Sequence, residues 1–148
     1  MIDRRSKKKV FVIFKESEDD RVSPKKFLRY GFSHVFIWMT YDTKTHGNTH
    51  KPYLQCDPLF SNLSLTRFSM SERDLIKSLN KPGYTVLKLI VEEGTTDFYQ
   101  MGLKLFTCVS IIKYILGIKC FAITPYQLYK RLLKMEGKQG IVSVKQIN

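Results

Sequence analysis

Short apolar runs rich in β-branched and aromatic residues recur through the first ninety or so positions, and they constrain the fold more than any other feature of the chain. Runs of this kind, separated by polar or proline-containing segments, are typical of strands. Five strands are therefore expected, at VFVIF (10–14), FSHVFIWMTY (32–41), PYLQCD (52–57), LSLTRFSM (63–70) and YTVLKLIVE (84–92).

Helix signals lie between and after these runs. SERDLIKSLN (71–80) opens with a serine cap and acidic residues, and the apolar segment 107–116 ends at Gly117, a residue favoured just after a helix. TPYQLYKRLLK (124–134) has a threonine cap, proline at the first helical position and glutamine at the third, which is a capping box. A short strand is expected at 118–123 and a weak one at IVSV (141–144). This order predicts an α+β fold, in which a cysteine-bearing helix packs on an antiparallel sheet.

The length and composition predict one packed domain. The chain has 148 residues, of which 43% are hydrophobic and 13% aromatic, so it can form a core. We expect a basic N-terminal arm at 1–9, a single α+β domain at 10–135 and a C-terminal tail at 136–148.

The sequence also predicts a compartment. No apolar run approaches the roughly 18–20 residues that cross a bilayer, and the basic N-terminus is followed by five apolar residues, too few for a secretory signal. The three cysteines are odd in number and form no C-x-x-C pair, which favours reduced thiols. A cytoplasmic protein without a membrane span is expected.

A basic excess is the strongest bias in the composition. Twenty-five Lys and Arg against thirteen Asp and Glu give a net charge of +12. Such a balance favours contact with polyanions, including nucleic acid or an acidic partner protein. The basic residues gather near both ends without forming a known recognition motif, so weak nucleic-acid contact through these ends is the expectation.

Cys108 begins the apolar helix expected at 107–116. Ile111, Ile112, Ile115 and Leu116 follow it by three, four, seven and eight positions and share its face, so a buried core cysteine explains the pattern. The second interpretation is chemical. A helix N-terminus stabilises a thiolate, which is the reactive form of cysteine.

Two further residues complete the set that a cysteine hydrolase needs. His34 interrupts an apolar strand, where a core histidine is the ordinary explanation, and Asp57 precedes a proline, where a turn residue is ordinary. Together with Cys108 they offer a nucleophile, a general base and an acceptor that orients the imidazole.

Four motifs in order carry a resemblance: GFSHVFIW, DPLFSNLSL, LFTCVSIIKYILGI and ITPYQLYKRLL. They resemble a family of short proteins encoded by phages and by alphaproteobacteria, over roughly residues 30–133. The order His, acid, Cys is also similar to the circularly permuted NlpC/P60 branch of papain-like enzymes. The resemblance implies a permuted papain-like fold, with Cys108 as nucleophile, His34 as base and Asp57 as orienting group. Ser110 departs from the family pattern, which often has an acidic residue there.

Two classes of function follow. The first is a phage-type papain-like cysteine hydrolase that cleaves a peptide, amide or other acyl bond in the host cytoplasm. The second is a non-enzymatic, basic virion-associated protein that retains the fold and holds nucleic acid or a virion protein by charge.

A metal site is the remaining alternative. His46 and His50 lie near Cys56 and Asp57, but they flank Gly-Asn in a turn and no second Cys/His pair follows. A solvated loop is expected there, and no metal or cofactor is predicted.

Overall fold

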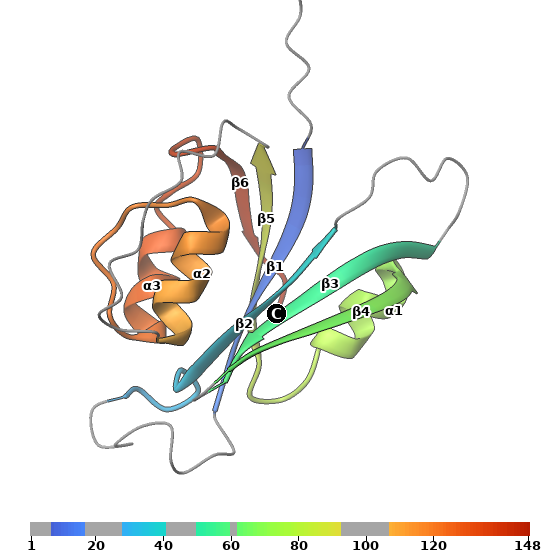
Figure 1. The fold of residues 1–148 in the computed structure, drawn as a ribbon, viewed down its shortest axis with the longest axis horizontal. Coiled ribbons are helices and arrows are strands. Elements are labelled where there is room, and N and C mark those ends of the chain that lie inside the picture. Colours follow the sequence, from blue (N-terminus) through green and yellow to red (C-terminus); the bar gives the residue numbers. More distant parts are fainter. Residues whose placement is uncertain (1–6, 17–27, 41–49, 60–61, 93–106) are drawn as a thin grey trace, which may run out of the picture.

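Six strands form one antiparallel sheet in the computed structural model of the protein, which describes residues 7–16, 28–40, 50–59, 62–92 and 107–148. The order across the sheet is β4-β3-β2-β1-β5-β6 (Figure 1). The strands are β1 (Lys7–Lys15), β2 (His34–Thr40), β3 (His50–Pro58), β4 (Leu63–Ser71), β5 (Thr85–Glu92) and β6 (Ile141–Gln146). All five strands expected between residues 10 and 92 are confirmed, with ends that differ by a few residues.

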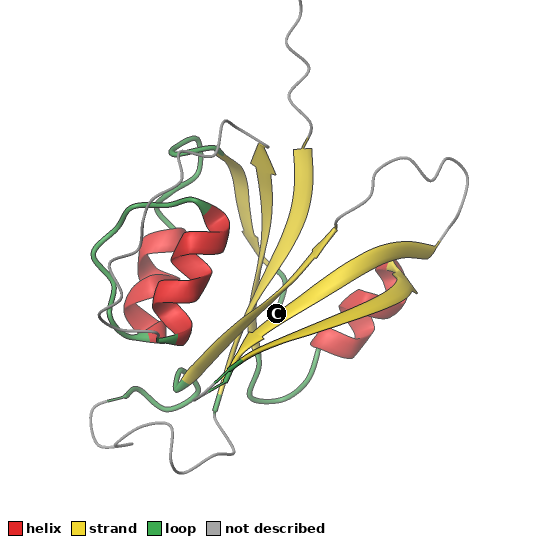
Figure 2. Ribbon diagram, viewed as in Figure 1, coloured by secondary structure: helices red, strands yellow, loops and turns green. Residues whose placement is uncertain are grey.

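Three helices cover the two faces of the sheet. They are α1 (Glu72–Leu79), α2 (Cys108–Leu116) and α3 (Pro125–Leu132). Helices α2 and α3 lie together on one side and α1 lies on the other, so the molecule has a helix–sheet–helix arrangement (Figure 2). A side-chain oxygen at each N-cap accepts a backbone N–H, at Ser71, Thr107 and Thr124. The α+β fold with a packed cysteine-bearing helix is therefore confirmed.

Two hydrophobic cores explain why β1 is apolar on both faces. Val10, Val12 and Phe14 point into the core beneath α2 and α3. Phe11 and Ile13 alternate with them and join the smaller core beneath α1. The sequence of a strand with both faces covered is a continuous apolar run, whereas the sequence of a half-exposed strand alternates between apolar and polar residues.

The sheet extends beyond the boundaries expected for the domain. Lys7–Lys9, expected in a basic arm, pair with Ile90–Glu92 of β5. The segment 136–148, expected as a tail with a weak strand at 141–144, contributes β6, which confirms that strand, pairs with β5 and buries Ile141 in the larger core. Backbone hydrogen bonds and one buried side chain therefore outweigh the polar composition of these ends.

One expected strand is wrong. Residues 118–123 connect α2 to α3 without strand pairing. Ile118 and Ala122 are buried in the larger core, which accounts for the apolar pattern. The Lys113 Nζ donates to the carbonyl oxygens of Cys120 and Ala122, at 3.1 and 3.2 Å, so a side chain satisfies backbone groups that a neighbouring strand would otherwise pair.

None of the helices in the described part of the chain is long and apolar enough to span a membrane.

Candidate active site

Cys108 is the first residue of α2, at an N-terminus closed by a capping box. The Thr107 Oγ1 accepts the Ser110 N–H at 3.1 Å, and the Ser110 Oγ accepts the Thr107 N–H at 2.9 Å. The first N–H groups of a helix have no partner within the helix. Because the cap takes the N–H of Ser110, those of Cys108 and Val109 remain at the positive end of the helix dipole.

The thiol lies on the flank of the buried face of α2. Val109, Ile112 and Leu116 are buried, whereas Cys108 is half-buried and packs against the edge of the larger core. The buried face of α2 is therefore centred on Val109, Ile112 and Leu116, one residue away from the face that was expected to include Cys108. A core cysteine would lie in its centre, so this placement leaves the sulfur partly accessible.

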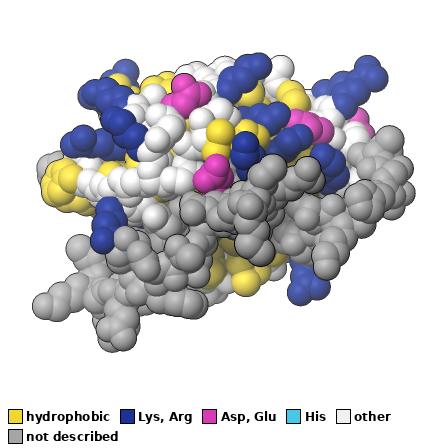
Figure 3. Space-filling view, turned by 90° about the horizontal axis from the view of Figure 1, so that it is seen from above, with side chains coloured by type: hydrophobic (Ala, Val, Ile, Leu, Met, Phe, Trp, Pro, Cys, Tyr) yellow, Lys and Arg dark blue, Asp and Glu magenta, His cyan; other side chains and the backbone are white. Residues whose placement is uncertain are grey.

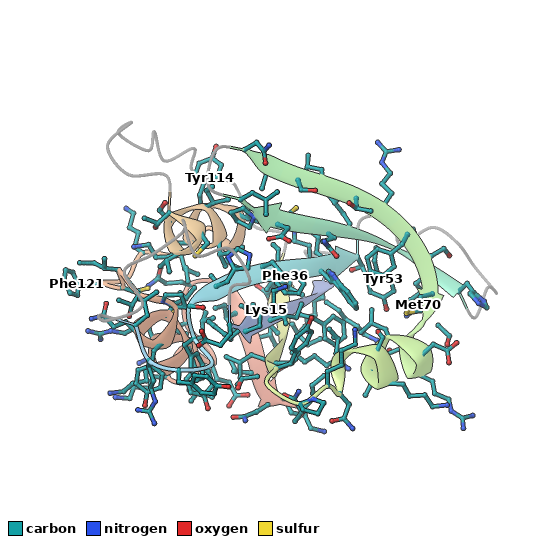
Figure 4. The ribbon with its side chains drawn as sticks, turned by 90° about the horizontal axis from the view of Figure 1, so that it is seen from below. Lys15, Phe36, Tyr53, Met70, Tyr114 and Phe121 are labelled. Atoms are coloured by element: carbon teal, nitrogen blue, oxygen red, sulfur yellow. The ribbon has the colours of Figure 1, made fainter. Side chains whose placement is uncertain are left out.

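His34 is the first residue of β2. Phe32, which precedes the strand, packs against the core beneath α2 and α3, while Phe36 belongs to the core beneath α1. The His34 and Phe36 rings are stacked with their centroids 6.2 Å apart, as expected for residues two apart on one face of a strand. The Lys15 Nζ lies 5.5 Å from the centroid of the Phe36 ring, and both residues are labelled in Figure 4.

Asp57 reaches His34 from the next strand. Ile37 pairs with Cys56, so Asp57 lies one step further along β3, toward the His34 end of β2. The His34 Nε2 and the Asp57 Oδ1 are 2.6 Å apart. Their side chains are 7% and 18% exposed, so the contact is largely shielded from water.

The electrostatics of His34 link it to both other residues. Burial, the largest influence, lowers the pKa of His34, but hydrogen bonding and charge interactions with Asp57 and Cys108 outweigh it and raise the pKa to about 9. The imidazole is therefore protonated at neutral pH. Because Nε2 contacts Asp57, Nδ1 is the ring nitrogen that remains for proton exchange with the thiol.

The structure thus brings the three residues predicted from the sequence into one cluster. The other two thiols lie elsewhere: Cys56 is buried in the larger core, and Cys120 is half-buried after α2. Burial, the largest influence on each, raises the pKa of both. Neither thiol appears among the groups that shift the pKa of His34.

Exposed apolar side chains lie in the β3–β4 hairpin. Leu59 follows Asp57 by two residues, and its N–H donates to the Asn62 carbonyl at 2.7 Å. Leu63 and Leu65 pair with Pro58 and Cys56, and all three leucines are more than 40% exposed, at 49%, 42% and 59%. Because side chains alternate along a strand, Leu63 and Leu65 lie on the face of Cys56, opposite to the Asp57 side chain.

The alternative metal site finds no support within the residues that the structure describes, where no group of three possible ligands occurs. His50 opens β3, and His46 lies outside the described residues.

Sequence reasoning missed Glu16. Its carboxylate accepts the Gly31 N–H and, at 3.1 Å, the Ser33 hydroxyl, immediately before His34. Glu16 is one of several acidic residues in KESEDD, and no motif distinguishes it from its neighbours.

Comparison with known proteins gives no family, curated sequence or solved structure that matches the chain.

Proposed function

We propose that the protein is a cysteine hydrolase of permuted papain-like type that cleaves a peptide, amide or other acyl bond. The observation that carries this proposal is the position of His34, whose Nε2 lies 2.6 Å from the Asp57 carboxylate and whose pKa is raised by Asp57 and by Cys108 at the N-terminus of α2. A nucleophile, a base and a group that orients the base are the parts of a nucleophilic hydrolase.

In the proposed first step the Cys108 thiolate attacks the carbonyl carbon of the substrate. The carbonyl electron pair moves to oxygen, and the N–H groups of Cys108 and Val109 at the start of α2 are the proposed donors for that oxyanion. The intermediate then expels the leaving group, which takes a proton from the His34 imidazolium, and a thioester on Cys108 remains.

In the second step water attacks the thioester. His34, now neutral, accepts a proton from the water, and collapse of the second intermediate releases the acid product and the Cys108 thiolate. Asp57 keeps the imidazole oriented through its contact with Nε2 and stabilises the imidazolium.

An activated ester tests this proposal without knowledge of the natural substrate. With p-nitrophenyl acetate, we expect release of p-nitrophenol and a transient acetyl adduct, which peptide mass spectrometry maps to Cys108. Cys108→Ser and His34→Ala should each reduce kcat/KM by at least about 100-fold, because each removes a member of the reacting unit.

Cys120→Ser is the matched control, because it removes another half-buried thiol from the same half of the chain. It should leave turnover unchanged. If Cys108→Ser hydrolyses the ester as fast as the unaltered protein, the hydrolase proposal is wrong and a non-enzymatic role of the fold is favoured.

A further inference from the structure

A turn before β2 determines how the chain arrives at His34. The Phe32 N–H donates to the Arg29 carbonyl at 2.9 Å, and Gly31 has φ +82°, a conformation that other residues adopt at a cost. Within the turn itself, one backbone hydrogen bond and the conformation of Gly31 are the local features that define its geometry.

Glu16 holds this turn from the neighbouring strand. Lys15 pairs with His34 at the end of β1, so Glu16 comes next to Ser33 one step beyond the paired residues. Its two carboxylate oxygens are divided between the Gly31 N–H and the Ser33 hydroxyl. Ser33 is 5% exposed, so this contact is made away from bulk water, where hydrogen bonds to a charged group are strong.

Phe32 provides a second anchor on the other side of the turn. Its ring lies 5.1 Å from the ring centroids of both Tyr126 and Tyr129 of α3. Glu16 therefore restrains the backbone of Gly31 and the side chain of Ser33, while α3 restrains the side chain between them. Together they define where His34 leaves the turn.

We propose that Glu16 is a positioning residue, which holds Gly31–Ser33 so that His34 meets both Asp57 and Cys108; this inference rests on the proposed function. The role is geometric, because Glu16 is not among the groups that shift the pKa of His34. An uncharged side chain with the same shape should therefore replace it.

Two substitutions separate geometry from charge. Glu16→Gln keeps an oxygen for the Gly31 N–H and an amide that can donate to the Ser33 hydroxyl, so kcat/KM for the ester should stay within about twofold of the unaltered protein. Glu16→Ala removes both contacts, and kcat/KM should fall at least about tenfold, because small misplacements of a catalytic group are costly.

The titration of His34, followed by NMR, is the second readout and needs no substrate. We expect its midpoint near 9 in the unaltered protein and in Glu16→Gln, and a midpoint closer to 6.5 in Glu16→Ala as the contacts to Asp57 and Cys108 loosen. This readout keeps Glu16 testable even if the unaltered protein hydrolyses no ester, a result that would refute the proposed function alone.

Glu136→Ala is the matched control. Its carboxylate also accepts a backbone N–H, that of Val144 at 3.2 Å, but it contacts β6 instead of the turn before β2. It should alter neither readout. If Glu16→Ala proves unfolded, Ser33→Ala removes one contact and should give a smaller shift in the same direction.

Two results would overturn the inference. One is a His34 midpoint and a kcat/KM in Glu16→Ala that equal those of Glu136→Ala. The other is a loss in Glu16→Gln as large as in Glu16→Ala, which would assign the effect to the charge of Glu16.

Discussion

His34 carries a charge that its own burial opposes. Burial acts most strongly on its pKa and lowers it, yet the contacts with Asp57 and Cys108 raise the pKa to about 9. A core histidine with a neutral ring would need no carboxylate at 2.6 Å. The raised pKa of His34 is therefore the residue-scale feature that most favours the proposed active site over ordinary packing.

Asp57→Asn should lower the pKa of His34, because it removes a charge and weakens the hydrogen bond that offset burial. We expect the NMR midpoint of His34 to fall by at least about one unit, a free-energy change of about 1.4 kcal/mol. An unchanged midpoint would show that Asp57 does not sustain the charge.

The same pair makes stability depend on pH. The folded-state pKa of His34, about 9, lies above the ordinary value of 6.5. Its contribution to the free energy of unfolding is therefore complete below pH 6.5 and lost as the pH rises through about 9. We therefore expect the free energies of unfolding of the unaltered protein and of Asp57→Asn, measured with urea, to become more similar as the pH rises from 7 to 10.

The three site residues were predictable from their chemical types and from the motifs around them, whereas Glu16 was not. Cys108, His34 and Asp57 each have an ordinary local explanation, but together they offer a nucleophile, a base and an orienting group. Glu16 gains its role from the pairing of β1 with β2, a contact between segments 17 residues apart at Glu16 and Ser33.

At the scale of elements, α1 is tied to the sheet by one carboxylate. The Glu72 oxygens each lie 2.6 Å from a lysine Nζ, one from Lys9 of β1 and one from Lys88 of β5. Burial, the largest influence, raises the pKa of Glu72, but hydrogen bonds and charge from the two lysines outweigh it and lower the pKa to about 2.

Glu72→Gln should destabilise the protein at neutral pH and have little effect in acid. The contribution of Glu72 is present above pH 4.5 and is lost as the pH falls through about 2. Because the group is partly exposed, we expect a loss of about 1 kcal/mol at pH 7. Urea unfolding at pH 7 and pH 2 measures the difference.

Asp74→Asn is the control, because Asp74 lies in the same first turn and contacts the Ser71 hydroxyl at 2.9 Å instead of a lysine. The Asp74→Asn variant should lose only the part of the free energy of unfolding that comes from the helix dipole and the N-terminal cap. Equal losses in both variants would mean that the two lysines add nothing to the stability of α1.

The ends of the helices could be predicted best from the sequence, and the connections between elements could be predicted least well. The caps at Ser71, Thr107 and Thr124 are short-range hydrogen bonds, which the local sequence specifies. The segment 118–123 alternates for a different reason, burial of Ile118 and Ala122 in the larger core. Side chains, among them those of Lys113 and Gln139, pair with its backbone groups. Periodicity alone cannot separate these two causes.

At the scale of the whole molecule, the site depends on strand order, which local patterns do not encode. β1 pairs with β2 on one side and with β5 on the other, and β6 closes the sheet from the C-terminal end of the chain. Strand types were predictable, but their neighbours depend on contacts across long sequence separations. The order places β2 and β3 side by side, which brings Asp57 to His34.

Half of the net charge of +12 lies in residues 107–148. Residues 107–148 contain seven Lys and Arg and one acidic residue, at Lys113, Lys119, Lys130, Arg131, Lys134, Lys138, Lys145 and Glu136. Figure 3 shows basic side chains outnumbering acidic ones on the face seen there. Under the proposed hydrolase function, this positive charge favours anionic or neutral substrates over cationic ones.

Competitive alkylation of the three cysteines tests the central claim, activation of Cys108 by His34, most directly. With limiting iodoacetamide at pH 7 and peptide mapping by mass spectrometry, we predict that Cys108 is modified well before Cys56 and Cys120, and that His34→Ala removes this preference while the protein stays folded. Equal modification of all three thiols, or modification of Cys108 after denaturation alone, would contradict the account and make Cys108 a structural residue.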